Sequence, residues 1–185
     1  MKTRTTFLLL LSLFVAGGAF AQKFITKTGY IRFYSEAPLE KIEANNHVVN
    51  SALDLSTGGF VFKVLMKSFE FQKALMQEHF NENYVESDKF PNATFAGTLT
   101  NFKEINVGKE GVYEANAEGK LTIHGVTRDI KVKGTFEARQ GKLIGKAKFN
   151  LTVADFNITI PGNVINNIAK TVEVTVELTM DKAGM

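Results

Sequence analysis

Alternation of apolar and polar residues is the dominant pattern along this chain. Near the C-terminal end, Val174, Val176 and Leu178 alternate with Thr175 and Glu177. A period of two is typical of a β-strand that has one face in the core and the other in water. Seven stretches have this pattern, and they cover residues 25–34, 60–66, 93–99, 113–123, 130–138, 143–153 and 172–180. The pattern therefore predicts a fold made mainly of β-strands, each with one buried face.

Two further segments modify this picture. Residues 42–55 alternate less regularly and predict two irregular strand segments. From Phe71 to Phe80 the apolar residues recur at helical spacing instead, which predicts one helix near residues 72–81. We therefore predict an antiparallel β-barrel of about eight strands with one inserted helix, because closure of the sheet would leave no exposed edge.

The predicted buried faces contain unusually small residues. Gly97, Gly119, Gly134 and Gly145 alternate with bulkier residues on those faces. Glycine and alanine leave volume that must be filled by a closely packed helix, by bulky residues opposite or by a ligand. Glycine also lets the strands of a barrel bend sharply, which is a competing explanation for the same positions.

Phenylalanine is the other unusual feature, with 16 residues in the chain and no tryptophan. One interpretation is an ordinary aromatic-rich core, and the other is the wall of a ligand site. An eight-stranded barrel is just wide enough for one small ligand, and an apolar chain gains about 0.8 kcal/mol for each methylene that it buries. On the second interpretation, the ligand-binding residues are inward phenylalanines and one leucine of the helix, namely Phe62, Phe71, Leu75, Phe80, Phe95, Phe136, Phe149 and Phe156.

The N-terminal segment has the composition of a cleavable secretory signal peptide, residues 1–21. Lys2 and Arg4 precede an apolar run over residues 7–16, and an Ala-Phe-Ala sequence supplies small residues at the cleavage positions. The apolar run is too short to span a bilayer comfortably, and the chain has no cysteine to which a lipid is attached. We therefore predict one domain, residues 22–185, that is periplasmic or secreted and has no stable insertion in a membrane.

Composition and motifs argue against several other classes of function. Without Lys2 and Arg4 the basic count falls from 22 to 20 against 19 acidic residues, and no polybasic stripe indicates a nucleic-acid site. His47, His79 and His124 are the only histidines, and their spacing matches no metal-binding motif. No Gly-x-Ser-x-Gly motif, catalytic cysteine or phosphate-binding glycine loop is present. The sequence thus predicts a non-catalytic protein without a cofactor or a metal.

Three segments resemble the YceI-like family, whose members have a lipocalin-like β-barrel and bind polyisoprenoid or related lipids. They are residues 75–84 with the following 90–97, the sequence Gly-Lys-Leu-Thr-Ile-His-Gly-Val-Thr-Arg at 119–128, and Ala-Asp-Phe-Asn-Ile at 154–158. The chain lacks the early Asp-Pro and His-Ser of many members, and Gln77-Glu78 replace the Arg-Asp that often precedes the helical histidine. The resemblance therefore implies a divergent branch of the family, with its barrel and an apolar ligand.

The hypothesis from the sequence is an antiparallel barrel that binds an apolar, isoprenoid-like or acyl-chain ligand, with the helix closing or lining one end. The alternative is a structural or interaction module whose interior is filled by its own phenylalanines. An enzyme of unknown type is a third possibility, and it would require buried titratable groups that converge in a cleft. For His124, a structural turn with Gly125 is favoured over contact with a ligand.

Overall fold

The computed structural model describes residues 22–184, so the predicted signal peptide lies outside the described residues. The described part of the chain contains eight long strands and a two-residue strand, β4. The strands are β1 (Lys23–Glu36), β2 (Lys41–Asp54), β3 (Gly59–Leu65), β4 (Glu70–Phe71), β5 (Asn92–Leu99), β6 (Gly111–Ile123), β7 (Val126–Arg139), β8 (Lys142–Thr152) and β9 (Thr171–Lys182).

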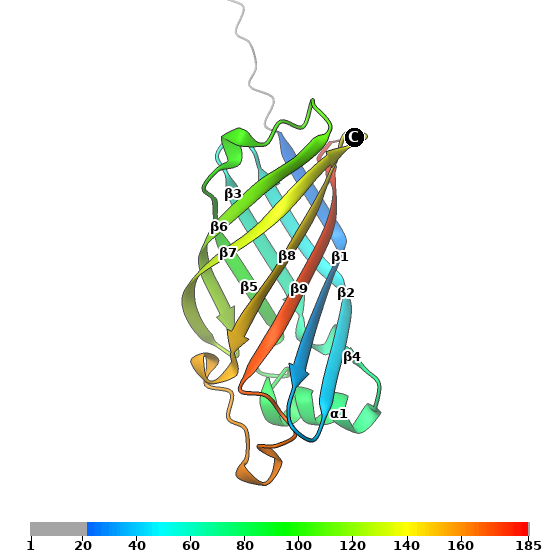
Figure 1. Cartoon of the computed structure of the whole chain (residues 1–185), viewed down its shortest axis with the longest axis vertical. Helices are drawn as coiled ribbons and strands as arrows, with labels where there is room; N and C mark the ends of the chain where they lie inside the picture. The colour runs from blue at the N-terminus through cyan, green and yellow to red at the C-terminus, as the bar shows by residue number, and fades with distance from the viewer. Residues whose placement is uncertain (1–21, 185) are drawn as a thin grey trace, which may run out of the picture.

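The long strands form a closed barrel (Figure 1). Their order is β1-β9-β8-β7-β6-β5-β3-β2, and pairing of β1 with β2 closes the ring. All of these pairs are antiparallel. This confirms the predicted eight-stranded antiparallel barrel. The expectation of two irregular segments over residues 42–55 is wrong, because this region forms the single strand β2, which pairs on both sides.

The one α-helix of the described residues is α1 (Ala74–His79), and it continues directly into the π-helical turn η2 (Phe80–Tyr84). Both fall close to the predicted helix at residues 72–81. No helix within residues 22–184 is long and apolar enough to cross a membrane. The short 3₁₀ turns are η1 (Met66–Ser68), η3 (Phe102–Glu104), η4 (Val153–Phe156) and η5 (Gly162–Val164).

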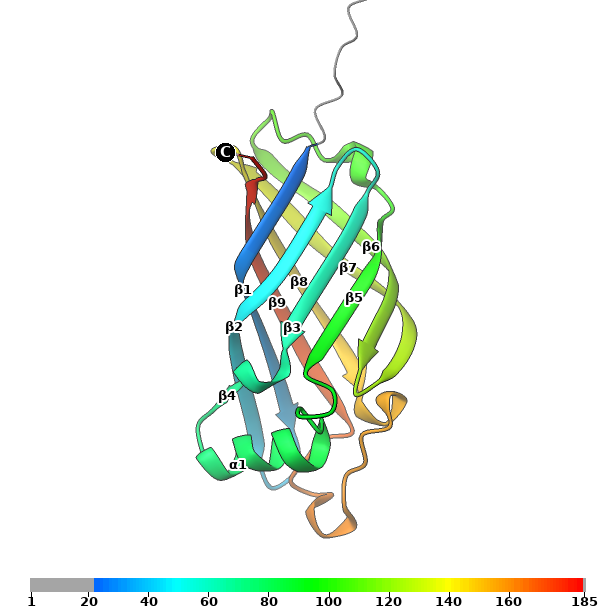
Figure 2. The same ribbon diagram turned by 180° about the vertical axis from the view of Figure 1, so that it is seen from behind.

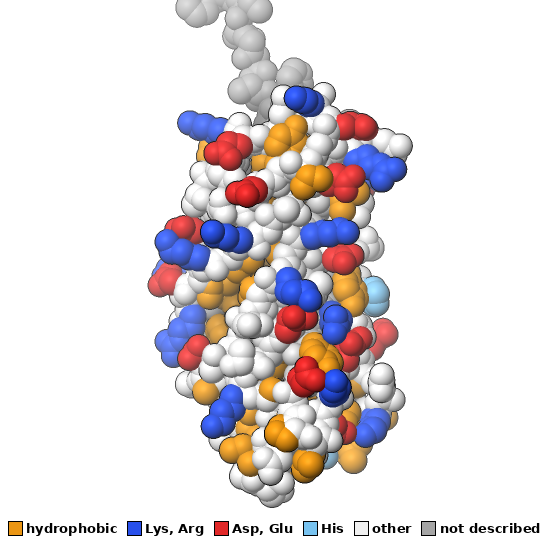
Figure 3. Space-filling view, viewed as in Figure 1, with side chains coloured by type: hydrophobic (Ala, Val, Ile, Leu, Met, Phe, Trp, Pro, Cys, Tyr) orange, Lys and Arg blue, Asp and Glu red, His pale blue; other side chains and the backbone are white. Residues whose placement is uncertain are grey.

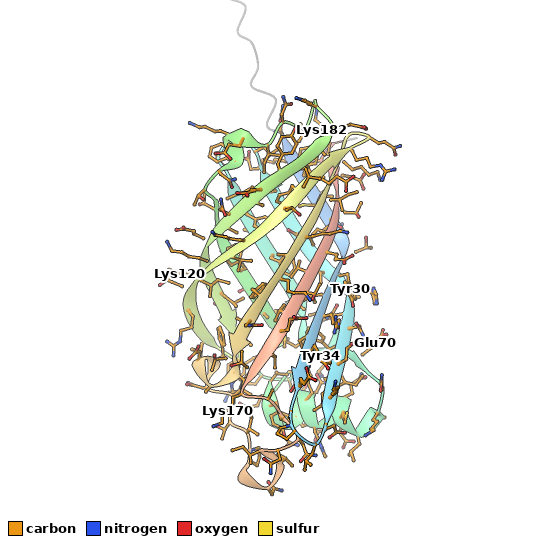
Figure 4. All side chains as sticks on the ribbon, in the orientation of Figure 1. Tyr30, Tyr34, Glu70, Lys120, Lys170 and Lys182 are labelled. Atoms are coloured by element: carbon orange, nitrogen blue, oxygen red, sulfur yellow. The ribbon has the colours of Figure 1, made fainter. Side chains whose placement is uncertain are left out.

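The two ends of the barrel differ in what surrounds them. At one end, called here the closed end, lie the start of β1, the end of β9 and the connection from β5 to β6 (Figures 1 and 2). At the other, the open end, lie α1 and residues 153–170, which join β8 to β9. In Figure 4, Lys182 marks the closed end and Lys170 marks the open end.

The closed end contains a group of large side chains that are almost completely buried. Leu53, Leu99, Leu143 and Met180 are each exposed by 1% or less. The connection between β5 and β6 covers them from outside, with Ile105 buried and Phe102 packed on the same core. This end of the barrel is therefore a solid hydrophobic core.

A Cβ added to any of the four inward glycines would lie within 3 Å of a neighbouring atom. A Cβ on Gly97 would lie 2.2 Å from the Glu118 carbonyl oxygen, and one on Gly119 would lie 2.5 Å from the Ala96 carbonyl oxygen. A Cβ on Gly145 would lie 2.7 Å from a ring carbon of Phe136. Ring packing at Gly145 matches one explanation left open by the sequence, a bulky residue opposite. Gly97 and Gly119 instead let two backbones approach closely, which was not among those explanations.

Candidate functional site

A cavity of about 440 Å³ occupies the open half of the barrel. Its volume falls within the range of about 300–1,000 Å³ that is usual for small-molecule sites. The wall consists of inward residues from the long strands, for example Leu121, Val132, Ala147 and Val176. These side chains are only partly buried, since they face the cavity rather than one another. The interior of the barrel is thus hollow at one end and solid at the other.

Three phenylalanines form the floor of the cavity, on the side of the closed end. Phe60 of β3 makes edge-to-face contacts with Phe95 of β5 and Phe136 of β7, with ring centroids 6.0 and 6.2 Å apart. Phe95 and Phe136 are buried. Edge-to-face packing of this kind adds to the stabilisation that burial alone provides. The floor therefore separates most of the cavity from the solid core, of which Leu99 also lines the cavity.

A second aromatic cluster attaches the helical segment to the wall near the open end. Phe33 of β1, Phe69, Phe71 of β4 and Phe80 of η2 have ring centroids between 5.1 and 5.7 Å apart. All four line the cavity. Because the rings come from β1, from residues 69–71 and from η2, the cluster fixes the position of α1 and η2 beside the opening.

The structure brings seven of the eight predicted ligand-binding residues to the cavity wall. The exception is Leu75, whose side chain is 60% exposed and does not line the cavity, so its assignment was wrong. Met76, His79 and Phe80 line the cavity instead. His79 and Phe80 follow Met76 by three and four positions, so the three residues share one side of the helix. The residues that line the cavity as predicted are Phe62, Phe71, Phe80, Phe95, Phe136, Phe149 and Phe156.

Several lining residues were absent from the predicted set. Phe33 and Phe60 line the cavity, and the same alternation that identified Phe62 places both on an inward face. The sequence therefore contained the signal for both residues. Phe69 and the apolar residues of 158–168 lie outside any regular strand. Periodicity gives no information about the inward side of such irregular segments, and this is why they were missed.

Polar side chains border the cavity mainly at its mouth. The Glu40 carboxylate accepts hydrogen bonds from Lys73 Nζ at 3.0 Å and from Asn167 Nδ2 at 3.5 Å. The hydrogen bond from Lys73 lowers the pKa of Glu40, and Asn167 acts in the same direction. Ser35 Oγ accepts a hydrogen bond from the Ala169 amide at 2.9 Å. These bonds tie the β1–β2 turn to α1 and to residues 153–170 around the opening.

Tyr84 is the other polar residue of interest in the wall. Partial burial raises the pKa of its phenol, so the hydroxyl stays protonated well above neutral pH. A neutral phenol both donates and accepts hydrogen bonds. Tyr84 is therefore a residue of the cavity wall whose side chain can donate a hydrogen bond.

The model of the YceI-like domain family matches residues 21–180. The chain belongs to the YceI-like family. This confirms the resemblance found in the sequence.

Solved structures of low sequence identity have the same fold as this YceI-like chain. A polyisoprenoid-binding domain from Saccharophagus degradans, implicated in plant cell wall breakdown, has a TM-score of 0.76 at 13% identity, over 88% of this chain and 99% of that one. BcnA of Burkholderia cenocepacia has a TM-score of 0.64 at 15% identity, over 82% and 95%. The YceI protein of Campylobacter jejuni has a TM-score of 0.55 at 15% identity, over 74% and 82%. No curated protein sequence matches the chain.

The segments that carried the family resemblance meet at one point outside the cavity. His124 and Gly125 form the tight turn between β6 and β7, with φ angles of 50° and 73°. His124 Nε2 lies 2.7 Å from Glu86 Oε2, and His124 Nδ1 lies 3.2 Å from the Phe156 carbonyl oxygen. The His124 ring also packs edge-on against Phe90, with centroids 4.8 Å apart.

The His124 network has a structural role in this YceI-like barrel. It joins the β6–β7 turn to the segment that follows η2 and to η4, and Arg128 Nε adds a 2.8 Å hydrogen bond to the Asp155 carbonyl oxygen. The hydrogen bond from His124 lowers the pKa of Glu86. His124 does not line the cavity. Within residues 22–184 no group of three or more His, Cys, Asp or Glu residues is placed to hold a metal ion.

Proposed function

We propose that this protein binds an apolar, lipid-like molecule, with an isoprenoid or acyl chain, inside the cavity. The binding is non-catalytic and takes place in the periplasm or outside the cell. The observation that supports this most directly is the apolar cavity of about 440 Å³, which has an aromatic floor and opens at one end of the barrel.

Hydrophobic burial is enough to supply the affinity. Each methylene of a chain gains about 0.8 kcal/mol when it leaves water for an apolar wall. Binding of such a chain requires few polar contacts, which agrees with a wall of aromatic and aliphatic side chains. The polyisoprenoid-binding domain of Saccharophagus degradans, which has the same fold, also supports this class of ligand.

The polar groups at the mouth favour binding over catalysis. Glu40 is already hydrogen-bonded to Lys73 and Asn167, and it lies at the rim rather than in the interior. A general acid or base usually sits where a substrate's reacting atom is held out of water. The location outside the cytoplasm is supported by the N-terminal sequence, in which Lys2 and Arg4 precede an apolar run and small residues.

The alternative of a barrel filled by its own side chains describes the closed end alone. There, Leu53, Leu99 and Met180 pack with almost no exposure. In the open half, Phe149 and Leu151 face the cavity and remain partly exposed. A solidly packed module would not leave aromatic side chains at an open void, because such a void forfeits packing energy.

The proposal is tested by native mass spectrometry and lipid extraction of protein purified without detergent. We expect an apolar molecule to be retained, or an added prenyl or acyl chain to bind. Repeated recovery of empty protein that has no affinity for either kind of chain would overturn the proposal.

A matched pair of variants shows whether the chain binds in the cavity. Ala147→Phe adds a ring to the wall, whereas Val112→Phe adds the same ring at a position that is 67% exposed. Displacement of only two methylenes removes about 1.6 kcal/mol, so Ala147→Phe is expected to weaken binding by about tenfold or more. Val112→Phe is expected to bind as the wild type does. Equal effects of the two variants would place the ligand elsewhere.

A further inference from the structure

Three large apolar side chains are exposed at the open end of the barrel. Leu39 is 73% exposed, Leu75 is 60% exposed and Ile165 is 44% exposed. None of them lines the cavity. They belong to the β1–β2 turn, to α1 and to the residues just after η5. An exposed cluster of this kind commonly marks a surface that meets another apolar phase.

The three segments that present these residues are joined to one another around the mouth. The Leu39 amide donates a 2.9 Å hydrogen bond to the carbonyl oxygen of Asn166, the neighbour of Ile165. Glu40, the neighbour of Leu39, binds both Lys73 of the α1 N-terminus and Asn167. Leu39, Leu75 and Ile165 are therefore carried on a connected rim, called here the open rim.

The open rim has an unusual distribution of charge. The segment from Phe156 to Ala169 contains no Asp, Glu, Lys, Arg or His. In Figures 1 and 2 this segment extends beyond the ends of the strands. Figure 3 shows blue and red side chains spread over the barrel wall, whereas the lower tip is orange and white. The part of the protein that projects farthest is thus apolar or uncharged.

Two lysines near the rim are paired with carboxylates, whereas Glu78, Glu82 and Lys170 form no ion pair among the described residues. Lys73 pairs with Glu40 at 3.0 Å, and Lys41 pairs with Glu36 at 2.8 Å. The unpaired charges are two acidic and one basic, so no excess of positive charge is present that would select anionic lipids. A protein partner would usually meet a rim of polar and charged groups around an apolar centre, and residues 156–169 supply no charged group. The charge pattern of the open rim matches an uncharged lipid surface.

We propose that the open rim docks on the surface of a neutral lipid bilayer, with Leu39, Leu75 and Ile165 entering the bilayer interface. Docking in this orientation places the mouth of the cavity against the membrane. An apolar chain then passes between bilayer and cavity without crossing water, which removes the cost of exposing its methylenes. This inference rests on the proposed function for the nature of the cargo, and it adds the membrane as the partner and the open rim as the contact surface.

The test compares two triple variants in binding to phosphatidylcholine vesicles. The rim variant is Leu39→Ser, Leu75→Ser and Ile165→Ser. The control variant replaces three valines on the barrel wall that are exposed by 48%, 50% and 67%, as Val48→Ser, Val61→Ser and Val112→Ser. Both variants have the same N-terminal segment, so any contribution from it cancels.

Wild type and the control variant are expected to sediment with the vesicles, equally in low and high salt. The rim variant is expected to lose about tenfold or more of this binding. The proposal is overturned if the wild type does not bind neutral vesicles, if binding requires anionic lipids or low salt, or if both variants lose it equally. Binding to another protein in place of the vesicles would also overturn it.

A second measurement separates docking from the proposed function. A fluorescent prenyl probe in detergent-free solution is expected to bind the rim variant with wild-type affinity, because none of the three side chains lines the cavity. Transfer of the same probe from vesicles to protein is expected to slow by about tenfold or more in the rim variant only. An unchanged transfer rate overturns the docking proposal. Failure of the probe to bind the wild type counts against the proposed function, whereas vesicle binding still decides the docking.

Discussion

Strand β8 runs through both ends of the barrel, and the burial of its inward residues changes along its length. Leu143 and Gly145, toward the closed end, are buried, whereas Ala147, Phe149 and Leu151, toward the open end, are partly exposed. The alternation of apolar and polar residues is the same throughout. Alternation therefore shows which side of a strand faces the interior, but it does not show whether the interior is filled at that level.

The connections between strands explain the difference between the two ends. At the closed end, the β5–β6 connection places Phe102 and Ile105 over the barrel. At the open end, the longer connections place α1 beside the opening and leave space between Met76 and Val164, which both line the cavity. The cavity therefore lies toward the open end, and the closed end is a packed hydrophobic core.

The largest expected effect comes from the same truncation made at both ends of β8. Leu143→Ala at the closed end is expected to cost about 3 kcal/mol of unfolding free energy, since a buried leucine loses contacts and leaves a void. Leu151→Ala at the cavity wall is expected to cost about 1 kcal/mol, because its side chain is already partly exposed. Urea unfolding of both variants measures the difference, and equal losses would contradict the contrast between the two ends.

A smaller effect is expected at the boundary between the two ends. Phe60→Leu removes the ring that contacts Phe95 and Phe136, and it is expected to cost about 1 kcal/mol of stability. It also lowers the floor of the cavity toward the closed end. The longest apolar chain that still gains affinity should therefore be longer for this variant. A titration with chains of increasing length measures this, and an unchanged limit would show that Phe60 is not the floor.

The network of His124 at the open end is expected to give a pH-dependent effect. The native state holds the pKa of Glu86 below its usual value through the hydrogen bond from His124, so the unfolded state binds more protons at this site. This contribution to stability is complete above the unfolded pKa of about 4.3 and is lost as the pH falls through the lower native pKa. Glu86→Gln should be less stable than wild type at neutral pH.

Urea unfolding at a series of pH values measures this effect. The stabilities of Glu86→Gln and of the wild type should approach each other as the pH falls below about 4.3. A gap between the two proteins that stays constant from neutral to acidic pH would contradict the role given to the carboxylate.

The smallest effect is expected at Tyr84, where the wall near the open end offers a hydroxyl. Tyr84→Phe should leave the affinity for a pure hydrocarbon chain unchanged. It should weaken the affinity for a chain with a carbonyl or hydroxyl group by a few fold, because a neutral hydrogen bond contributes about 1 kcal/mol. Parallel titrations with the two kinds of ligand check this. An equal loss for both would show that the hydroxyl acts through packing alone.

The barrel and most of its inward side chains were predictable from the sequence. Alternation placed Phe62, Phe95, Phe136 and Phe149 on inward faces, because the two faces of a strand are set by local geometry. Helical spacing located α1, but it did not tell the cavity side from the solvent side, and Leu75 was misplaced by one position. The orientation of so short a helix depends on the aromatic cluster that holds it.

The position of the cavity was not predictable from local patterns. The glycines pointed to the correct faces for a different reason, since Gly97 and Gly119 permit two backbones to approach. The position of the cavity depends on contacts between residues that are far apart in the sequence. One example is the packing of the β5–β6 connection on the core at the closed end. The uncharged segment 156–169 was visible in the sequence, but its place at the mouth depends on the course of the chain.

The most direct test of the central claim is the affinity of the protein for a series of straight acyl chains of increasing length. If a chain lies in the apolar cavity above a firm aromatic floor, each added methylene gains about 0.8 kcal/mol, or about fourfold in affinity, until the cavity is full. We expect a steep rise followed by a plateau, and a plateau at a shorter length for Ala147→Phe. An affinity that does not depend on chain length, or a plateau that this variant leaves unmoved, would contradict the account.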